Sequence, residues 1–211
     1  WKALQMREQL EHELGKAGIA YELIQTETPR HGIELAAQAT LAGFSPIISA
    51  GGDGSISEVV NGVVQASVSR GTPPPPIGVL PMGTANDLIV NLKLPLNLGQ
   101  AVQVIAAGQT RFIDLGKVTA WDVDGKSAQT RYFDNNSAIG LEPSVTLIQQ
   151  QIKWLRGTLR YLLATMIAIM RNPQWTMHLQ WPGGEYHGPS TLVTAGNNPL
   201  TGGLFYMAPH A

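Results

Sequence analysis

The sequence predicts an α/β fold, in which a mostly parallel, doubly wound sheet in the first half is followed by an antiparallel, β-rich second half. Short apolar runs alternate with helical patterns up to about residue 107, which is typical of a parallel sheet covered by helices. Beyond Gly108 the runs alternate with period two and meet at hairpin turns. Glycine-containing turns follow two of the parallel strands, at the edge of the sheet where such folds bind ligands.

The predicted elements of the first half follow one another in regular order. An amphipathic helix carrying Trp1, Leu4, Leu10 and Leu14 ends near Gly15 and Gly18. After it we expect strands at 21–25, 46–50 and 77–80, and helices at 33–42, 55–66, 84–92 and 99–107.

The second half is predicted from hairpins and one helix. Strands at 111–120 and 129–133 are joined by the turn 122–125, and strands at 175–181 and 190–195 flank a turn at 182–184. One long helix is expected over about 145–171. We place the domain boundary near residue 108, which gives an α/β domain over 1–108 and a β-rich domain over 109–211.

The predicted long helix has an apolar stripe with a basic stripe beside it. The apolar residues recur at steps of four and three, and the basic ones at steps of three and four. The apolar residues are Ile148, Ile152, Leu155, Leu159, Leu162, Met166 and Ile169, and the basic residues are Lys153, Arg156 and Arg160. Two interpretations stay open: a surface for an anionic membrane or an acyl chain, and an ordinary core helix with one solvated face.

Composition narrows the classes of partner. Among the 211 residues, 14 are Lys or Arg and 15 are Asp or Glu, so the balance does not favour a nucleic-acid partner. The absence of cysteine excludes disulfides and thiolate metal sites within this sequence. No run approaches the roughly 18 apolar residues of a membrane-spanning helix, so we expect a cytoplasmic protein that touches a membrane from one side.

The patterns at both ends of the sequence are typical of the middle of a domain. The first helix begins at Trp1 without a capping residue, so we expect a strand before it. The sequence 201–211 stops in mid-pattern. We therefore expect a fragment that is truncated at both ends.

The first glycine-rich loop is Gly51-Gly52-Asp53-Gly54, which leads into a helix at Ser55. Successive backbone N–H groups and the positive end of a helix dipole suit a phosphate at this position. The loop matches neither a Walker A sequence nor the dinucleotide fingerprint. The alternative is a tight structural turn in which Asp53 caps the helix.

The second loop, residues 81–87, follows the next strand in the same context. Thr84 can donate to a phosphate oxygen, Asn86 can cap or bind, and Asp87 adds a second carboxylate. Asp53 and Asp87 would repel a polyphosphate unless Mg²⁺ lay between them. One of the two carboxylates could instead accept the proton of an attacking hydroxyl.

The stretches 51–62 and 81–88 resemble the two signature loops of the diacylglycerol kinase catalytic domain family. The nearest branch is the bacterial lipid kinases, which resemble sphingosine and ceramide kinases and, more remotely, NAD kinases. The similarity continues through 114–116, 133–136 with Gly140, 156–157 with Tyr161, 196–197 and 202–203, and ends at 208–209.

The resemblance implies an α/β nucleotide-binding domain followed by a β-sandwich domain, with ATP in a cleft and a lipid hydroxyl as acceptor. Asp53, Asp87 and Asp114 fall on acidic positions of the family's active centre, which makes them candidate catalytic residues. Ser55 stands where threonine is usual. The implied nucleotide-binding residues are Thr28, Gly51, Gly52, Asp53, Gly54, Ser55, Ile56, Ser57, Gly83, Thr84 and Asn86.

Three family segments are expected outside the sequence. An Asn-Pro-x-Ser-Gly phosphate loop would precede Trp1, and an Asp-Gly metal segment and the usual general base would follow Ala211. Asp53 is thus a candidate metal ligand, with the main ligands beyond residue 211.

The function we expect is an ATP- and Mg²⁺-dependent lipid kinase, peripheral at the inner face of the membrane. An NAD kinase-like soluble kinase and a non-catalytic nucleotide- or lipid-binding module are the alternatives. The acceptor lipid and the oligomeric state, a homodimer included, are left open.

Several further polar residues have a plain structural interpretation. For Asn135, Asn136, Asn197 and Asn198, backbone hydrogen bonding at turns is favoured over a role in binding. Glu58 and Asn61 are one helical turn apart and could face the cleft, with capping and solvation as equal alternatives. The five histidines show no metal-ligand spacing.

Overall fold

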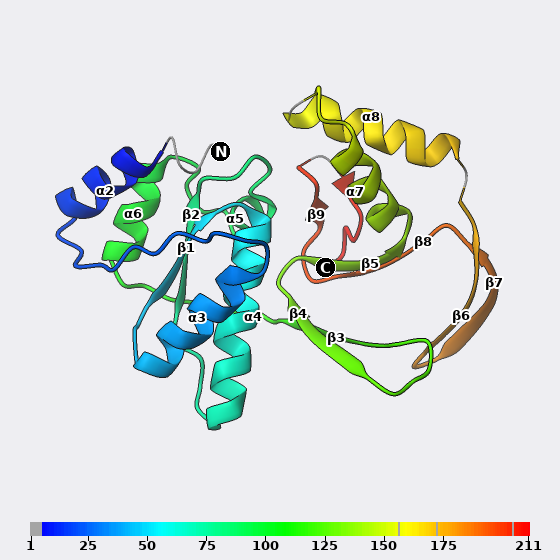
Figure 1. Cartoon of the computed structure of the whole chain (residues 1–211), viewed down its shortest axis with the longest axis horizontal. Coiled ribbons are helices and arrows are strands. Elements are labelled where there is room, and N and C mark those ends of the chain that lie inside the picture. Colours follow the sequence, from blue (N-terminus) through cyan, green and yellow to red (C-terminus); the bar gives the residue numbers. More distant parts are fainter. Residues whose placement is uncertain (1–5, 156, 172, 204) are drawn as a thin grey trace. The chain divides into compact units, whose positions relative to one another are not determined.

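A computed structural model describes residues 6–155, 157–171, 173–203 and 205–211 of the chain. Its contacts divide it into two compact units, one formed by Trp1–Asn135 with Gly196–Ala211 and the other by Asn136–Ala195. Figure 1 shows the elements of both along the chain. The boundary predicted near residue 108 lies inside the first unit and stays a prediction.

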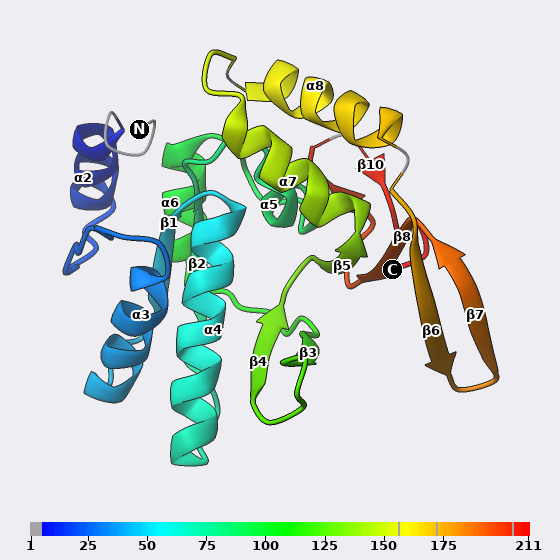
Figure 2. The ribbon, with the colours of Figure 1, turned by 45° about the vertical axis from the view of Figure 1, so that its right-hand side comes forward.

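The first unit is built on a parallel strand pair covered by helices. Strands β1 (Ile47–Gly51) and β2 (Ile77–Pro81) run parallel, with Ile47 opposite Ile77. Helices α3 (His31–Ala42) and α4 (Asp53–Arg70) lie on one side of them, and α2 (Arg7–Lys16) and α6 (Leu98–Ala106) on the other, as Figure 2 shows. The predicted α/β architecture is confirmed.

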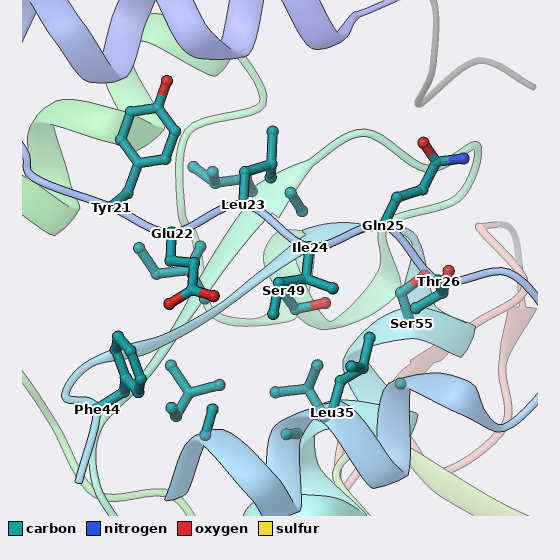
Figure 3. A pocket seen from close by; sticks show the side chains of 18 of the residues that line it. Tyr21, Glu22, Leu23, Ile24, Gln25, Thr26, Leu35, Phe44, Ser49 and Ser55 are labelled. Carbon is teal, nitrogen blue, oxygen red and sulfur yellow. The ribbon is translucent and has the colours of Figure 1, made fainter. Parts of the chain in front are cut away.

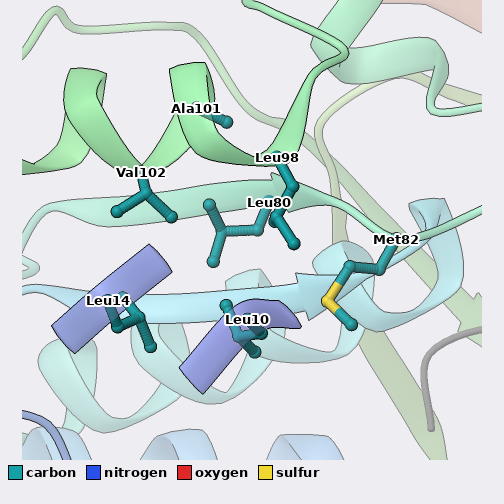
Figure 4. Packing of buried hydrophobic residues seen from close by; sticks show 7 residues of the cluster. All are labelled: Leu10, Leu14, Leu80, Met82, Leu98, Ala101 and Val102. Atoms are coloured by element: carbon teal, nitrogen blue, oxygen red, sulfur yellow. The ribbon is translucent and has the colours of Figure 1, made fainter. Parts of the chain in front are cut away.

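Apolar side chains from both helical layers pack against the strands. On one side, Leu10 and Leu14 of α2 meet Val102 of α6 over Leu80 of β2 (Figure 4). On the other side, buried residues of α3, β1 and α4 pack together, and a further cluster joins α4 to the short helix α5 (Asp87–Asn91). The strand ends are therefore packed on both sides, which positions the loops that follow them.

Three predicted boundaries in this unit were wrong. Residues 21–25, predicted as a strand, are extended but form no strand, because no hydrogen-bonded neighbour pairs with them among the described residues. The helix predicted from residue 84 begins only at Asp87, since Asn86 has a left-handed φ of 55°. The strand predicted from residue 111 begins at Gly116.

The remaining strands of the first unit form short antiparallel pairs. Strands β3 (Gly116–Trp121) and β4 (Ala128–Phe133) make the predicted hairpin. The Asp122 carboxylate accepts hydrogen bonds from the N–H groups of Lys126 and Ser127 and so closes the turn. Near the end of the chain, β9 (Leu200–Thr201) pairs with β10 (Phe205–Tyr206).

The second unit combines two strand pairs with two helices. Strand β5 (Asn136–Gly140) pairs with β8 (Leu192–Gly196), and β6 (Trp175–Trp181) forms a hairpin with β7 (Gly184–Ser190). The turn predicted at 182–184 is present, but the partner predicted at 190–195 was wrong, because that stretch is mostly β8 and pairs with β5. The two helices are α7 (Leu141–Gln151) and α8 (Gly157–Met170).

The prediction of one long helix was wrong, because α7 and α8 are separate. Ile152 leaves the helix with φ −84° and ψ 85°, and Gly157 has a positive φ of 62°. The break changes which residues of α8 face inward: Ala164 and Ala168 pack against Ile148 of α7.

The apolar stripe of the sequence is therefore split between core and surface. On α8 the side chains of Leu159, Met166 and Ile169 are exposed, whereas Ile148 on α7 is buried. Arg156 of the predicted basic stripe lies outside the described residues. In the described part of the chain, no helix has both the length and the apolar character needed to cross a membrane.

Candidate phosphate-binding site

The first loop leaves backbone donors free at the start of a long helix. Strand β1 ends at Gly51, and α4 begins at Asp53 with Gly52 as its N-cap residue, which has no side chain to cap it. The first intrahelical bond runs from the N–H of Ile56 to the carbonyl of Gly52, at 3.0 Å. The N–H groups before Ile56 in the first turn have no partner within the helix. This end of the 18-residue helix therefore suits an anion.

The second loop touches the first, backbone against backbone. A Cβ atom placed on Gly52 would lie 3.0 Å from the Cα of Gly83, and one on Gly83 would overlap the Cα of Gly52. The N–H of Met82 also donates to the carbonyl of Gly51 at 3.1 Å. The structure thus brings together the two loops that the sequence singled out, and glycine is required at their contact.

Hydrogen bonds within the second loop hold its shape. The N–H of Gly83 donates to Oδ1 of Asn86 at 3.0 Å, and Asn86 is itself buried. Thr84 is exposed at the tip of the loop. Asn86 therefore braces the loop, and Thr84 presents its hydroxyl to solvent or ligand.

The two loop aspartates have different surroundings. Asp87 is only 5% exposed, and its carboxylate accepts hydrogen bonds from the N–H groups of Gly202 at 2.5 Å and Gly203 at 2.7 Å. Asp53 is partly exposed, and its Oδ1 accepts from the N–H of Leu88 at 3.2 Å. Asp87 anchors the C-terminal segment to the second loop, while Asp53 links the first loop to the start of α5.

The other two candidate residues of the sequence lie in exposed coil. Asp114 precedes β3, and its backbone carbonyl accepts a hydrogen bond from Nδ2 of Asn197 at 2.7 Å. Thr28 lies in the turn before α3, where its carbonyl accepts from the N–H of His31 at 3.2 Å.

The turn that contains Thr28 is attached to α4 by Glu58. The Glu58 carboxylate accepts hydrogen bonds from the N–H of Arg30 at 3.0 Å and of Gly32 at 2.9 Å. These donors stand at the start of α3, so Glu58 supplies the cap that α3 does not obtain from Arg30. Of the interpretations of Glu58, the structure supports capping. The same hydrogen bonds hold the turn that contains Thr28 near α4, the helix of the first loop.

A buried acid next to the first loop was missed by the sequence analysis. Asp134, directly after β4, is 5% exposed. Burial raises the pKa of its carboxyl group, and the negative charge of Asp53 raises it further. The available signal was a charged residue placed directly after an alternating strand.

Asparagines tie the segments around the site together. Asn61 of α4 exchanges hydrogen bonds with the backbone of Tyr132 on β4, and Asn197 donates to the carbonyl of Asp134. Asn135 donates to the carbonyl of Leu200 at 3.0 Å. Backbone hydrogen bonding, predicted for the turn asparagines, is confirmed for Asn135, Asn197 and Asn198, whereas Asn136 donates to the Glu142 carboxylate.

The described residues do not form a metal site on their own. Across the described ranges, no three acidic, histidine or cysteine side chains are grouped so that they could hold a metal ion. Asp53 is the first residue of α4 and so belongs to the turn that carries the free donors. A magnesium ion that is held mainly by phosphate oxygens and water needs few protein ligands, but the structure gives no support for a complete site.

Two glycine loops at the carboxyl ends of adjacent parallel strands, joined at the start of an uncapped helix, define an α/β domain that suits phosphate. The profile of the diacylglycerol kinase catalytic domain matches residues 2–118 of this chain. The chain belongs to that family.

Individual relatives agree with this assignment. A Chromohalobacter salexigens protein named "Probable lipid kinase YegS-like" is 33% identical over 85% of this chain and 54% of its own length. A Staphylococcus aureus protein named diacylglycerol kinase is 28% identical over 97% of this chain and 63% of its own length. The chain therefore spans less than two thirds of these relatives.

Solved structures share the fold. A crystal structure of a diacylglycerol kinase from Bacillus anthracis superposes with a TM-score of 0.64 at 20% identity, covering 94% of this chain and 61% of the other. Another structure from the same organism gives a TM-score of 0.71 at 21% identity, with coverages of 96% and 64%. These likenesses support the α/β domain followed by a β-rich region.

Proposed function

We propose that the protein containing this chain is a lipid kinase, which transfers the γ-phosphoryl group of ATP to the free hydroxyl of diacylglycerol or a related lipid. The family assignment and the names of the relatives support a lipid kinase. The observation that carries the proposal is the contact between Gly52 and Gly83, because it joins two phosphate-suited loops into one surface.

The loop residues divide the work of binding. At the start of α4, the N–H groups of Asp53, Gly54 and Ser55 donate hydrogen bonds to phosphate oxygens. The hydroxyl groups of Ser55 and Thr84 donate to neighbouring oxygens of the same phosphates. Close approach of the phosphates to the loop backbones depends on Gly51, Gly52, Gly83 and Asn86. The first turn of α4 is completed by Ile56 and Ser57. Thr28, held through Glu58, contacts the nucleoside part.

Asp53 is the proposed acceptor of the lipid hydroxyl proton among the three aspartates. Asp87 already accepts two backbone hydrogen bonds, and Asp114 is exposed in coil. Mg²⁺ bound to the triphosphate would supply positive charge against the transferring group. The described residues do not complete a metal site, so no step is derived from the metal.

The test is transfer of labelled γ-phosphate by the full-length protein to diacylglycerol, phosphatidylglycerol, a sphingoid base and NAD in parallel. We expect label in a lipid, strongly reduced in Asp53→Asn and unchanged in the control Asp124→Asn, whose side chain is exposed in the β3–β4 turn. Label in NAD alone would make the protein an NAD kinase. Nucleotide binding without any transfer would make it a binding module.

The exposed face of α8 is the proposed surface for the membrane. Leu159, Met166 and Ile169 are exposed there, and Trp154 in the preceding turn is 77% exposed. Lys153 stands next to this tryptophan. Exposed apolar side chains with a lysine shortly before them in the chain suit the anionic inner leaflet, where the lipid substrate would be met.

Vesicle binding tests this surface. Replacing Lys153 by Gln removes about 1 kcal/mol of attraction to anionic lipid, which is about fivefold in affinity. Binding of the full-length protein to vesicles with and without phosphatidylglycerol measures it at low salt. Lys126→Gln, on the β3–β4 hairpin, is the control. If Lys153→Gln and Lys126→Gln bound anionic vesicles with equal affinity, α8 would be interpreted as a helix that only packs against α7.

A further inference from the structure

A cavity of about 1180 Å³ in the first unit offers no imidazole ligand for a metal ion. Figure 3 shows the segment that contains Tyr21 and Leu23 along one side of it and Leu35 of α3 along another. The carboxylates of Glu22 and Glu58 line it, but no histidine does among the described residues. Two imidazole groups come together instead in the second unit, on the hairpin of β6 and β7.

The hairpin pairs two histidines that are nine positions apart in the sequence. His178 on β6 lies directly opposite His187 on β7. The two-residue turn 182–183 closes the hairpin after Trp181, and from there hydrogen-bonded and non-hydrogen-bonded pairs alternate, which makes His178 and His187 a non-hydrogen-bonded pair. In such a pair the Cα atoms are about 4.5 Å apart and the side chains approach most closely. Spacing along the sequence does not reveal this pair, because strand register creates it.

The two imidazole rings are at a distance that suits a shared ion. Their centroids are 5.9 Å apart, and their planes meet at 72°. Bonds from Zn²⁺ to imidazole nitrogen are about 2.0–2.1 Å long, so two rings on one ion have centroids about 5–6 Å apart. One ion can therefore bind both rings after no more than a side-chain rotation.

A carboxylate on the same face of the hairpin supports His178. Glu185 lies two residues before His187 and so diagonally opposite His178, and its Oε2 is 3.4 Å from Nε2 of His178. When the imidazole is neutral and its proton is on Nε2, facing the carboxylate, Nδ1 is left to bind an ion. Carboxylates in this position orient metal-binding histidines, and their charge attracts a cation.

This face of the hairpin is open to solvent. His178, Glu185 and His187 are all exposed, the side chain of His178 by 53%. Leu179 and Trp181 of β6 point to the other face, since successive side chains of a strand alternate. An ion can therefore reach the two imidazoles without any opening of the fold.

We infer that His178 and His187 form an open surface site for a transition-metal ion such as Zn²⁺, with Glu185 orienting His178. Imidazole nitrogen is a preferred ligand of Zn²⁺, Cu²⁺ and Ni²⁺, whereas Mg²⁺ prefers oxygen. The described residues group no third side chain for a closed site, so water fills the remaining positions of the ion. The ion ties β6 to β7, and this role is separate from phosphoryl transfer.

Zinc titration of the full-length protein, first freed of metal by a chelator, tests the site. In NMR spectra of the protein with labelled histidine, the ring resonances of His178 and His187 should shift together with Zn²⁺, and Mg²⁺ should shift neither. In His187→Gln the affinity measured at His178 should fall about tenfold or more. The control His12→Gln, exposed on α2, should titrate as the wild type does.

Two results of the titration would overturn the inference. Equal affinity at His178 in the wild type and in His187→Gln would mean that each histidine binds zinc alone. The absence of any shift would make the two rings a cross-strand packing contact and nothing more.

Copper identifies the ligands. Cu²⁺ binds nitrogen sites more tightly than Zn²⁺ does, and its EPR spectrum reports the nitrogens bound to it. We expect two histidine nitrogens in the wild type and in His12→Gln, and one fewer in His178→Gln and in His187→Gln. The same spectrum in all four proteins would overturn the inference. These exposed substitutions should leave labelled phosphate transfer unchanged, so the result does not depend on the proposed function.

Discussion

The two glycine loops look alike in sequence but differ in how their polar groups are used. The loop that begins α4 leaves its first backbone donors uncapped, and its aspartate, Asp53, is partly exposed. The loop before α5 is closed on itself through Asn86, and its aspartate, Asp87, is buried under two backbone hydrogen bonds. The first loop has backbone donors left for a ligand, whereas in the second loop the N–H of Gly83 and the carboxylate of Asp87 are already engaged within the protein.

The contrast shows that residue type alone does not separate a binding group from a bracing group. Both loops offer a glycine, a hydroxyl and a carboxylate at the end of a parallel strand. What differs is the supply of partners nearby, since the C-terminal segment brings Gly202 and Gly203 to the second loop. Substitutions should therefore affect activity at the first loop and stability at the second.

The largest expected effect is at Asp53. In Asp53→Asn the side-chain oxygen that accepts from Leu88 is kept, but the negative charge is lost. We expect phosphoryl transfer to lipid to fall by about 100-fold or more, as for loss of a group that moves a proton. The free energy of unfolding should change by less than about 1 kcal/mol. If Asp53→Asn kept the wild-type kcat but lost stability, Asp53 would be a bracing group, and the proposed roles of the two loops would be reversed.

The next largest effect is expected for Asp87→Asn. The amide can accept one of the two backbone N–H groups but turns its own NH₂ towards the other, which leaves a buried donor unpaired. We expect the free energy of unfolding to fall by about 2–3 kcal/mol, measured by urea denaturation of the full-length protein.

Residual activity separates the two roles of Asp87. Well below the unfolding midpoint, the folded fraction of this variant should keep transfer within about tenfold of wild type. Unchanged stability with activity lost would mean that Asp87 acts in catalysis and that the loops are equivalent.

The contact between the loops is tested by a pair of glycine substitutions. In Gly83→Ala the new methyl group would overlap the backbone of Gly52, so we expect a loss of about 2 kcal/mol. In Gly54→Ala the new methyl meets nothing within 4 Å, and a helical position gains propensity, so stability should rise by up to about 1 kcal/mol. Thermal melts of both variants compare them, and equal melting temperatures would mean that the loops do not touch.

Local patterns predicted much of the fold, because alternation and turn chemistry act over a few residues. The helices after β1 and before β3 and the hairpin of β3 and β4 are present where the patterns place them, whereas β6 pairs with 184–190 and not with the predicted strand at 190–195. Segment 21–25 failed because pairing depends on a neighbour distant in sequence. The prediction of one long helix failed because the apolar stripe of the sequence continues past Ile152, where α7 ends, and periodicity does not reveal such a break.

The candidate site was predictable where the signal was glycine and less so where it was burial. The positions of both loops followed from strand ends. The different surroundings of Asp53 and Asp87 did not, because they depend on Gly202 and Gly203, more than 100 residues away. Asp134 was missed for the same reason: its burial is set by segments that return to β4 late in the chain.

The smallest expected effect concerns Asp134 and depends on pH. Burial raises the pKa of this carboxyl group above its unfolded value of about 3.8. As pH rises through that window, the unfolded chain loses its proton before the folded one, so stability falls and then levels off. Asp134→Asn should therefore raise the unfolding midpoint at pH 7 and leave it nearly unchanged near pH 3.

Asp122 gives a control of opposite sign, because hydrogen bonds from Ser127 and Lys126 lower the pKa of its carboxyl group. Its stabilisation is present above the unfolded pKa and is lost as pH falls through the folded one, so Asp122→Asn should lower the midpoint at pH 7. Denaturation curves of both variants across pH measure the difference. If Asp134→Asn destabilised at pH 7, the ionised Asp134 would be a stabilising partner in the site, and the first loop would be braced as firmly as the second.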